Sequence, residues 1–224
     1  MRARERILGR LRATALPHPP EPPEVASWYA GRQRNETRPQ QIERLRSALE
    51  AARAEVHDAR DAAWPAIVKG LAEAKGVRRL LAGSGSPDAA RLAQALPAGI
   101  ELVCFDRPID DWRDELFDTI DAGLSRAKGA IAETGSLILW PDAHEPRTVS
   151  LVPPIHFVLV DVGTLHPDFH TAMQAGRWAE NLPTNALLVS GPSKTADIQQ
   201  TLAYGAHGPR ELIVLLIDEE GAGK

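Results

Sequence analysis

Residues 77–105 read VRRLLAGSGSPDAARLAQALPAGIELVCF, and this stretch decides the fold class. The aliphatic runs VRRLLAG and IELVCF are typical of short buried strands, and PDAARLAQAL between them is typical of a helix. A helix of about ten residues between two strands favours a right-handed crossover, which makes the two strands parallel. The stretch therefore predicts part of a mainly parallel α/β sheet.

The same alternation continues on both sides of this stretch. We expect further strands within residues 130–140, 154–161, 186–191 and 211–218. We expect helices over residues 40–59, 63–76, 111–124, 168–180 and 195–205. The strand runs between residues 127 and 161 are too close together for helical crossovers, so an antiparallel hairpin is expected there. The sequence thus predicts an α/β fold in which helices alternate with the strands of a mainly parallel sheet.

The N-terminal residues 1–39 differ in composition from the rest of the chain. Residues 1–14 contain five arginines against one glutamate, and Ile7, Leu8 and Leu11 fall on one side of the predicted helix. The segment LPHPPEPPE follows, and its five prolines in nine residues favour an extended polyproline II spacer. We therefore predict a basic, proline-rich arm at 1–39 and an α/β domain at 40–224. The arm either packs on a partner or is a frayed terminus.

Composition argues against several classes of function. The net charge of −4 argues against general nucleic-acid binding. No run of about 18 apolar residues is present, so no membrane span is expected. The N-terminus lacks the apolar core of a signal peptide, and a cytoplasmic protein is therefore expected. The single cysteine, Cys104, cannot hold a zinc ion or an iron–sulfur cluster alone. His166 and His170 lack an evident third ligand, so no metal site is predicted.

Two glycine-rich junctions follow predicted strands and are candidate ligand sites, because ligands of open α/β sheets gather where strands lead into helices. In LLAGSGSPDAA, Gly83, Ser84 and Gly85 permit a tight turn before a helix whose N–H groups could hold an anion. The junction has neither a GxGxxG fingerprint nor a P-loop lysine. It is therefore either a ligand contact or only a structural turn.

The second junction, LLVSGPSKTADIQQTL, is the stronger candidate for anion binding. Ser193, Lys194, Thr195 and Asp197 crowd into the first turn of the predicted helix 195–205. Capping explains one hydroxyl, whereas two hydroxyls and an ammonium beside free N–H groups suit a carboxylate or phosphate. A well-capped helix without a ligand is the alternative.

Three further polar residues could form a second site or an interface. His207 and Arg210 follow the predicted helix, whose two ends would lie about 11 Å apart, so they are expected away from Ser193. His156 stands in the apolar run PIHFVLVD, where a core histidine bonded to the backbone is the simplest interpretation.

The run AIAETGSLILW contains one candidate for acid–base chemistry. Gly135 marks a bend, and Glu133 beside Thr134 at a strand end is placed as a general base or ligand contact. A simple hairpin turn is the alternative. The sequence leaves open whether Glu133 and Ser193 share one pocket.

Four of these segments together resemble the lactate-utilisation protein C family, also described as the LUD-domain group. They are AIAETGSLIL, SLVPPIH, SGPSKTADIQQTL and GAHGPRELIV, in that order. The resemblance covers roughly residues 40–217, and the basic N-terminal helix is also similar to that of the family. Lys194 stands where the family often has arginine.

The resemblance implies a three-layer α/β fold like that of the NagB, ribose-5-phosphate isomerase and CoA-transferase group, with helices on both faces of the sheet. It also implies a role beside iron–sulfur partner proteins that oxidise L-lactate to pyruvate. The clusters are expected in those partners, so no cofactor is expected in this chain. No catalytic residue set is carried over.

Two functions follow from these observations. The first is a subunit or accessory factor of a lactate-oxidising iron–sulfur system, itself without cluster ligands. The second is a small-molecule enzyme of the isomerase or transferase type that acts on a phosphorylated, carboxylated or CoA-linked substrate. The first is preferred, because the resemblance implies it, the redox ligands are missing and the charged arm is suited to docking.

Overall fold

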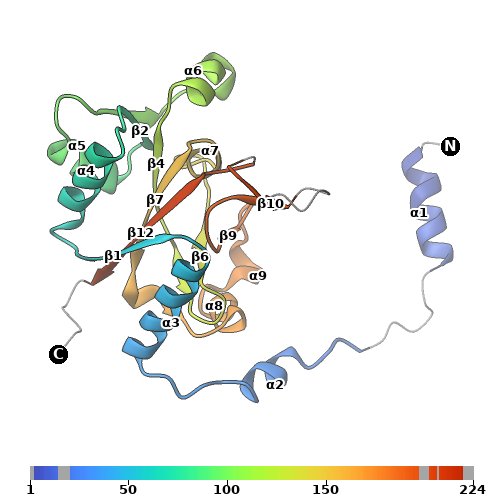
Figure 1. Ribbon diagram of the computed structural model, residues 1–224. Helices are drawn as coiled ribbons and strands as arrows, with labels where there is room; N and C mark the ends of the chain where they lie inside the picture. The colour runs from blue at the N-terminus through green and yellow to red at the C-terminus, as the bar shows by residue number, and fades with distance from the viewer. Residues whose placement is uncertain (1–2, 15–20, 197–201, 206, 219–224) are drawn as a thin grey trace. The chain divides into compact units, whose positions relative to one another are not determined.

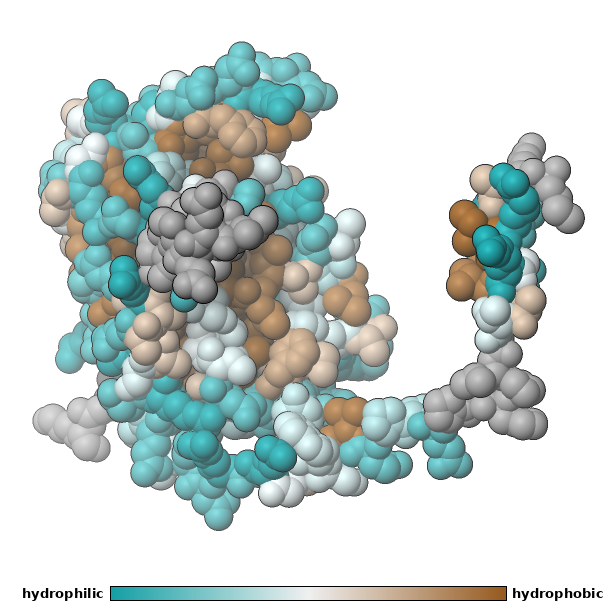
Figure 2. Space-filling view, turned by 45° about the vertical axis from the view of Figure 1, so that its right-hand side comes forward, coloured by the Kyte–Doolittle hydropathy of each residue, from teal (hydrophilic) through white to brown (hydrophobic). Residues whose placement is uncertain are grey.

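A computed structural model describes residues 3–14, 21–196, 202–205 and 207–218. The chain divides into two units, Met1–Gln33 and Arg34–Lys224. The first unit contains α1 (Ala3–Ala13) and α2 (Val25–Ala30). In Figure 2 the apolar residues of α1 form one brown stripe beside teal charged residues, and the side chains of Ile7 and Leu11 are exposed. The domain boundary after residue 39 stays a prediction.

The second unit is built on a six-stranded sheet with the order β1-β12-β7-β4-β2-β3, and all its strand pairs are parallel. Its strands are β1 (Glu55–Arg60), β2 (Arg79–Gly83), β3 (Glu101–Phe105), β4 (Ala122–Arg126), β7 (Ile155–Asp161) and β12 (Glu211–Asp218). The predicted α/β fold with a mainly parallel sheet is therefore confirmed.

One face of this main sheet is covered by α4 (Trp64–Ala74) and α5 (Pro87–Ala95), which lie on the same side of it in Figure 1. Trp64 and Leu92 from these helices pack with Phe157 and Leu215 of the sheet, and all four side chains are fully buried or nearly so. The helix α5 begins as the sequence predicts, because the Ser86 side chain accepts a hydrogen bond from the Ala89 amide.

The opposite face is covered by α3 (Arg38–Ala51) and by a smaller sheet, whose order is β8-β5-β6-β9. The small sheet consists of β5 (Gly129–Ile131), β6 (Ser136–Leu139), β8 (Leu165–His166) and β9 (Leu187–Val189). The strands β5 and β6 pair antiparallel, which confirms the hairpin expected in this region. The short 3-10 helix η2 (Val162–Thr164) joins β7 to β8.

Four short helices complete the packing. The helices α6 (Arg113–Asp118) and α7 (Thr148–Leu151) cover the face of the main sheet that also carries the small sheet, on its β2–β3 side. The 3-10 turn η1 (Ile109–Asp111) precedes α6. The helices α8 (Phe169–Ala175) and α9 (Trp178–Asn181) pack against Ile131 and Ile138 of the small sheet. No helix in the described part of the chain is both long enough and apolar enough to cross a membrane.

Two predicted helices are shorter than expected, and strands replace their ends. The helix predicted over 40–59 ends at Ala51, because Arg53 adopts a left-handed backbone with φ 70° and the Ala54 amide turns back to the Leu49 carbonyl. The remainder forms β1. The helix predicted over 111–124 likewise gives way to β4, a central strand of the main sheet.

The helix predicted over 195–205 is wrong at both ends. The strands β10 (Lys194–Ala196) and β11 (Leu202–Tyr204) pair antiparallel, with Lys194 opposite Tyr204. Residues 197–201 between them lie outside the described residues. Strand pairing has therefore overridden a helix-like local sequence.

The close packing of β4 against α7 gives a test of the fold. A Cβ atom at Gly123 would lie 2.2 Å from the backbone oxygen of Val149, so Gly123→Ala should lower the free energy of unfolding by about 1–3 kcal/mol. Gly70→Ala is the matched control at an exposed position of α4, where a new Cβ meets nothing within 4 Å and should stabilise by about 0.5–1 kcal/mol. Urea denaturation of both variants measures these changes. Equal stabilities would contradict the packing.

Candidate functional site

The segment after β9 turns sharply against the end of α3. Gly191 has φ 140°, and a Cβ atom there would lie 2.9 Å from both the Cβ and the backbone oxygen of Ala52. Only glycine combines this backbone conformation with so close an approach. The turn Ser190–Pro192 is therefore held beside the connection between α3 and β1.

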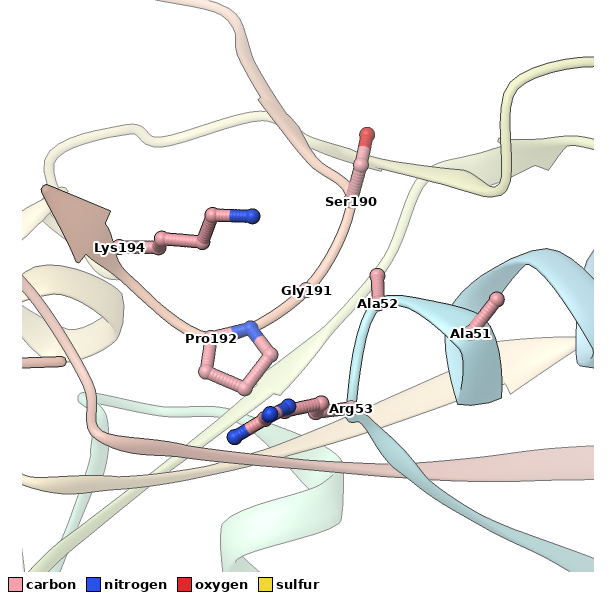
Figure 3. A pocket seen from close by; sticks show the side chains of 7 residues that line it. All are labelled: Ala51, Ala52, Arg53, Ser190, Gly191, Pro192 and Lys194. Carbon is pink, nitrogen blue, oxygen red and sulfur yellow. The ribbon is translucent and has the colours of Figure 1, made fainter. Parts of the chain in front are cut away.

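A cavity of about 460 Å³ lies at this junction, and two of its lining residues carry positively charged side chains. Figure 3 shows its lining side chains, with Arg53 and Lys194 on either side of Pro192. None of the seven described residues lining it is acidic. They are Ala51, Ala52, Arg53, Ser190, Gly191, Pro192 and Lys194. Two cations with a hydroxyl and no acid suit a small anion.

A second cavity of about 190 Å³ also borders Ser190 and Gly191. Among the polar residues that line it are Ser150, His156, Ser193 and His207. Because both cavities share Ser190 and Gly191, we treat them as one candidate site. The name Ser190 site is used below for the residues lining these two cavities.

Three hydroxyl groups in series connect Ser190 to the β5–β6 turn. The Thr134 and Ser136 hydroxyl oxygens lie 2.7 Å apart, and the Ser136 and Ser190 hydroxyl oxygens also lie 2.7 Å apart. Ser136 is buried, whereas Thr134 is exposed. The predicted contact residue Thr134 is thus coupled to the site through hydrogen bonds, although it lines neither cavity.

His156 lies at the start of β7 with only 1% of its surface exposed. Its Nε2 is 3.1 Å from the Ser125 hydroxyl, so its described partner is a side chain and not the backbone that the sequence suggested. Burial lowers the pKa of His156 to about 3, which keeps the imidazole neutral at physiological pH. The second cavity therefore contains a neutral imidazole.

The β10–β11 hairpin brings together groups that the predicted helix would have separated. The Ser193 amide donates to the Pro209 carbonyl at 2.8 Å, and the Gly205 amide donates to the Ser193 carbonyl at 2.9 Å. His207 therefore lines the same cavity as Ser193, and the expected separation of these two is wrong.

The other predicted residues of this region have different positions. Arg210 is exposed, its side chain packs against Gly205, and it lines neither cavity. Thr195 lies in β10, but its side chain, like the whole of Asp197, lies outside the described residues. Their roles in anion binding stay predictions.

Glu133 and Gly135 occupy the turn between β5 and β6. Gly135 has φ 62°, and a Cβ atom there would lie 2.5 Å from the Cβ of Ala48 in α3. Glu133 is exposed and is not among the residues lining either cavity of the Ser190 site. The turn therefore positions Thr134, while the suggested base Glu133 has no described contact with the site.

The glycine-rich junction Gly83–Gly85 lies at the carboxyl end of β2, whereas the Ser190 site adjoins the amino ends of β7 and β12. Gly83, Ser84 and Gly85 line a separate cavity of about 310 Å³, together with Glu145. Burial raises the pKa of Glu145 to about 7. The two junctions that the sequence treated alike thus belong to different sites.

Sequence reasoning missed Arg53, Ser125 and Glu145. Arg53 was placed within the helix predicted over 40–59, and Ser125 directly after the helix predicted over 111–124, so neither position pointed to a site. No sequence pattern marked Glu145, because its side chain reaches the cavity only through the packing of its own loop on Gly83. Among the described residues, no group of three or more His, Cys, Asp or Glu side chains could hold a metal ion.

The raised pKa of Glu145 predicts a pH-dependent stability. Between pH 4.5 and about 7 the folded chain keeps a proton that the unfolded chain has released, so this contribution is present at low pH and lost as the pH rises. Relative to Glu145→Gln, the wild-type free energy of unfolding should fall by about 1.4 kcal/mol per pH unit in that window. Urea denaturation at several pH values measures it. Parallel pH profiles for the two chains would contradict it.

Comparison with known proteins places these features in a family. The LUD domain family matches residues 42–217. An uncharacterised protein of Neisseria meningitidis serogroup B is 43% identical over 224 residues, covering 97% of this chain and 94% of that protein. A crystal structure of a DUF162 family protein from Deinococcus radiodurans has a TM-score of 0.60 and 24% identity, covering 81% of this chain and 99% of that chain, and so shows the fold.

Several relatives, among them the following two, have a function in their names. Lactate utilization protein C of Macrococcus caseolyticus is 31% identical over 110 residues, which cover 47% of this chain and 48% of that protein. Lactate utilization protein C 1 of Bacillus mycoides is 34% identical over 107 residues, which cover 45% of this chain and 44% of that protein. The match thus spans about half the length of these relatives. The resemblance read from the sequence is confirmed, and the chain belongs to the LUD domain family.

Proposed function

We propose that this chain takes part in lactate utilisation as a subunit or accessory factor of an L-lactate-oxidising system, and that its Ser190 site binds a small carboxylate. The observation that supports this most directly is the cavity lined by Arg53 and Lys194 without an acid. The names of the partly matching relatives support the pathway. In this proposal the small-molecule anion is lactate or pyruvate.

The geometry suits a hydroxy acid in three respects. A guanidinium can hold a carboxylate through two hydrogen bonds, and the Lys194 ammonium adds a second positive charge. The Ser190 hydroxyl borders the same cavity and can contact a further oxygen of the ligand. The apolar side chains of Ala51 and Ala52 can face a methyl group such as that of lactate.

The redox step is assigned to partner proteins in this proposal. Cys104 is the one cysteine of the sequence, is half-buried in β3 and lines neither cavity of the Ser190 site. One thiolate does not ligate an iron–sulfur cluster by itself. The proposed partners are therefore iron–sulfur proteins that accept the electrons of lactate oxidation.

The lysine of the cavity provides the first test. Lys194→Gln should weaken L-lactate binding about tenfold or more, because a charge-assisted hydrogen bond contributes roughly 1.5–3 kcal/mol. Isothermal titration calorimetry measures the dissociation constant. Lys69→Gln, on α4 at the opposite face of the main sheet, is the matched control and should leave it unchanged. Unchanged L-lactate binding in the Lys194 variant would contradict the proposal that this cavity binds the carboxylate.

The arm provides the second test. Ile7 and Leu11 are 60% and 61% exposed and lie among arginines, as expected of a helix that docks on an acidic, partly apolar partner surface. The double variant Ile7→Glu, Leu11→Glu should lose co-purification with tagged iron–sulfur partners. Gly9→Ala keeps the apolar stripe and should retain it. If the double variant still co-purifies fully, the arm is not the docking element.

A further inference from the structure

The cavity beside Gly83, which lies apart from the two cavities of the Ser190 site, is not used by the proposed function. It measures about 310 Å³ and lies where β2 ends, between the Gly83–Ser86 loop and the turn Asp142–Glu145. The two segments are joined by a hydrogen bond of 2.9 Å from the Ser84 amide to the His144 carbonyl. The carboxyl ends of parallel strands are where open α/β sheets bind small molecules.

The backbone places the Glu145 side chain in a defined position. A Cβ atom at Gly83 would lie 2.9 Å from the Cβ and 3.2 Å from the Cγ of Glu145, so a glycine is needed for this approach. The Asp142 carboxylate accepts hydrogen bonds from the His144 amide at 2.7 Å and from the Glu145 amide at 2.8 Å. The turn is thus held rigidly, with Glu145 directed toward the sheet.

Behind Glu145 lies a buried polar chain. The Ser125 hydroxyl is a hydrogen-bond partner of the Glu145 carboxyl, and it is also 3.1 Å from Nε2 of His156. Ser125 and His156 are each only 1% exposed. Since His156 in turn lines the smaller cavity of the Ser190 site, the three side chains link two cavities through the interior.

The charges around Glu145 favour its protonated form. Burial is the main cause that raises the pKa of Glu145, and Asp142 in the same turn and Asp88 in α5 raise it further. Arg126 of β4 does not compensate, because its guanidinium makes two hydrogen bonds to Asp88, at 2.6 and 2.7 Å. His156 is neutral. His144 also lines the cavity, and its charge lowers the pKa of Asp142 and not that of Glu145. Among the described residues no cation pairs with Glu145, and a partly buried carboxyl that faces a cavity in this way is typical of functional sites.

We propose that this cavity is a second small-molecule site, which binds an uncharged, polyhydroxylated compound through hydrogen bonds to the protonated Glu145 carboxyl. The lining combines hydroxyls, glycine backbone, two carboxyls and one imidazole, and its residues are Gly83, Ser84, Gly85, Ser86, Asp142, His144 and Glu145. Carboxyls repel an anion but accept hydrogen bonds from ligand hydroxyls. Ser125 and His156 act as positioning residues that hold the Glu145 carboxyl toward the cavity.

The site can be tested on the full chain with a neutral carbodiimide, a reagent that adds to protonated carboxyls, followed by mass spectrometry. At pH 6 we expect faster modification at Glu145 than at the exposed Glu133, which is the matched control. Between pH 6 and pH 8 the rate at Glu145 should fall about tenfold, as for a group that titrates near neutrality. D-ribose should protect Glu145, whereas L-lactate should not.

The variant Ser125→Ala tests whether Ser125 controls the protonation of Glu145, or whether the reactivity of Glu145 depends only on its exposure to the reagent. Ser125→Ala removes the hydrogen bond that lowers the pKa of Glu145, so it should increase modification at pH 8 relative to the wild type. The proposal is overturned if Glu145 reacts no faster than Glu133 at pH 6, or if D-ribose gives no protection. Loss of lactate binding in Lys194→Gln would leave these outcomes unaffected, so the two sites are tested independently.

Discussion

The strands β7 and β12 are buried on both faces, and the other layers of the α/β domain are arranged around them. They pair in parallel over seven positions, from Glu211 opposite Ile155 to Ile217 opposite Asp161. Their alternate side chains belong to two separate hydrophobic clusters, one under α4 and α5 and one under α3 and the small sheet. Because buried backbone and apolar side chains must both be kept from water, neither face can be left open.

That requirement also creates the Ser190 site. The small sheet covers one face of β7 and β12 only as far as β9, and the chain then has to return to β12 across the amino ends of these strands. The turn at Gly191 and the β10–β11 hairpin make this return. The cavities lie on either side of the turn because α3, the turn and the hairpin meet there without filling the space.

Much of the fold could be predicted from hydrophobic runs, and the exceptions have physical causes. The strands β2, β3, β7 and β12 are aliphatic and were predicted, whereas β4 reads AGLSR and looks unlike a strand. Gly123 is required because the Val149 carbonyl packs directly against it. Ser125 and Arg126 form hydrogen bonds with His156 and Asp88, respectively. When tertiary contacts determine the residue types of a strand, its local sequence shows little of the periodicity that predicts strands.

The candidate site was predicted in part for a similar reason. Ser193, Lys194, His156 and His207 could be selected by residue type and by their neighbours in the chain, and the structure brings them to the Ser190 site. Their mutual arrangement depends on a hairpin that the local sequence disguises as a helix. The position of Arg53 at the cavity depends on its own left-handed backbone conformation, and no periodic pattern marks such a position.

The series of hydroxyls from Thr134 through Ser136 to Ser190 has a direction as well as a position. Each hydroxyl carries one proton, so two protons fill the two hydrogen bonds and the third is left at one end. With the chain in one orientation the remaining proton belongs to Ser190, and with the other orientation it belongs to Thr134. An anion beside Ser190 selects the first orientation. Filling the cavity would therefore reverse the polarity of a hydroxyl at the protein surface without moving the backbone.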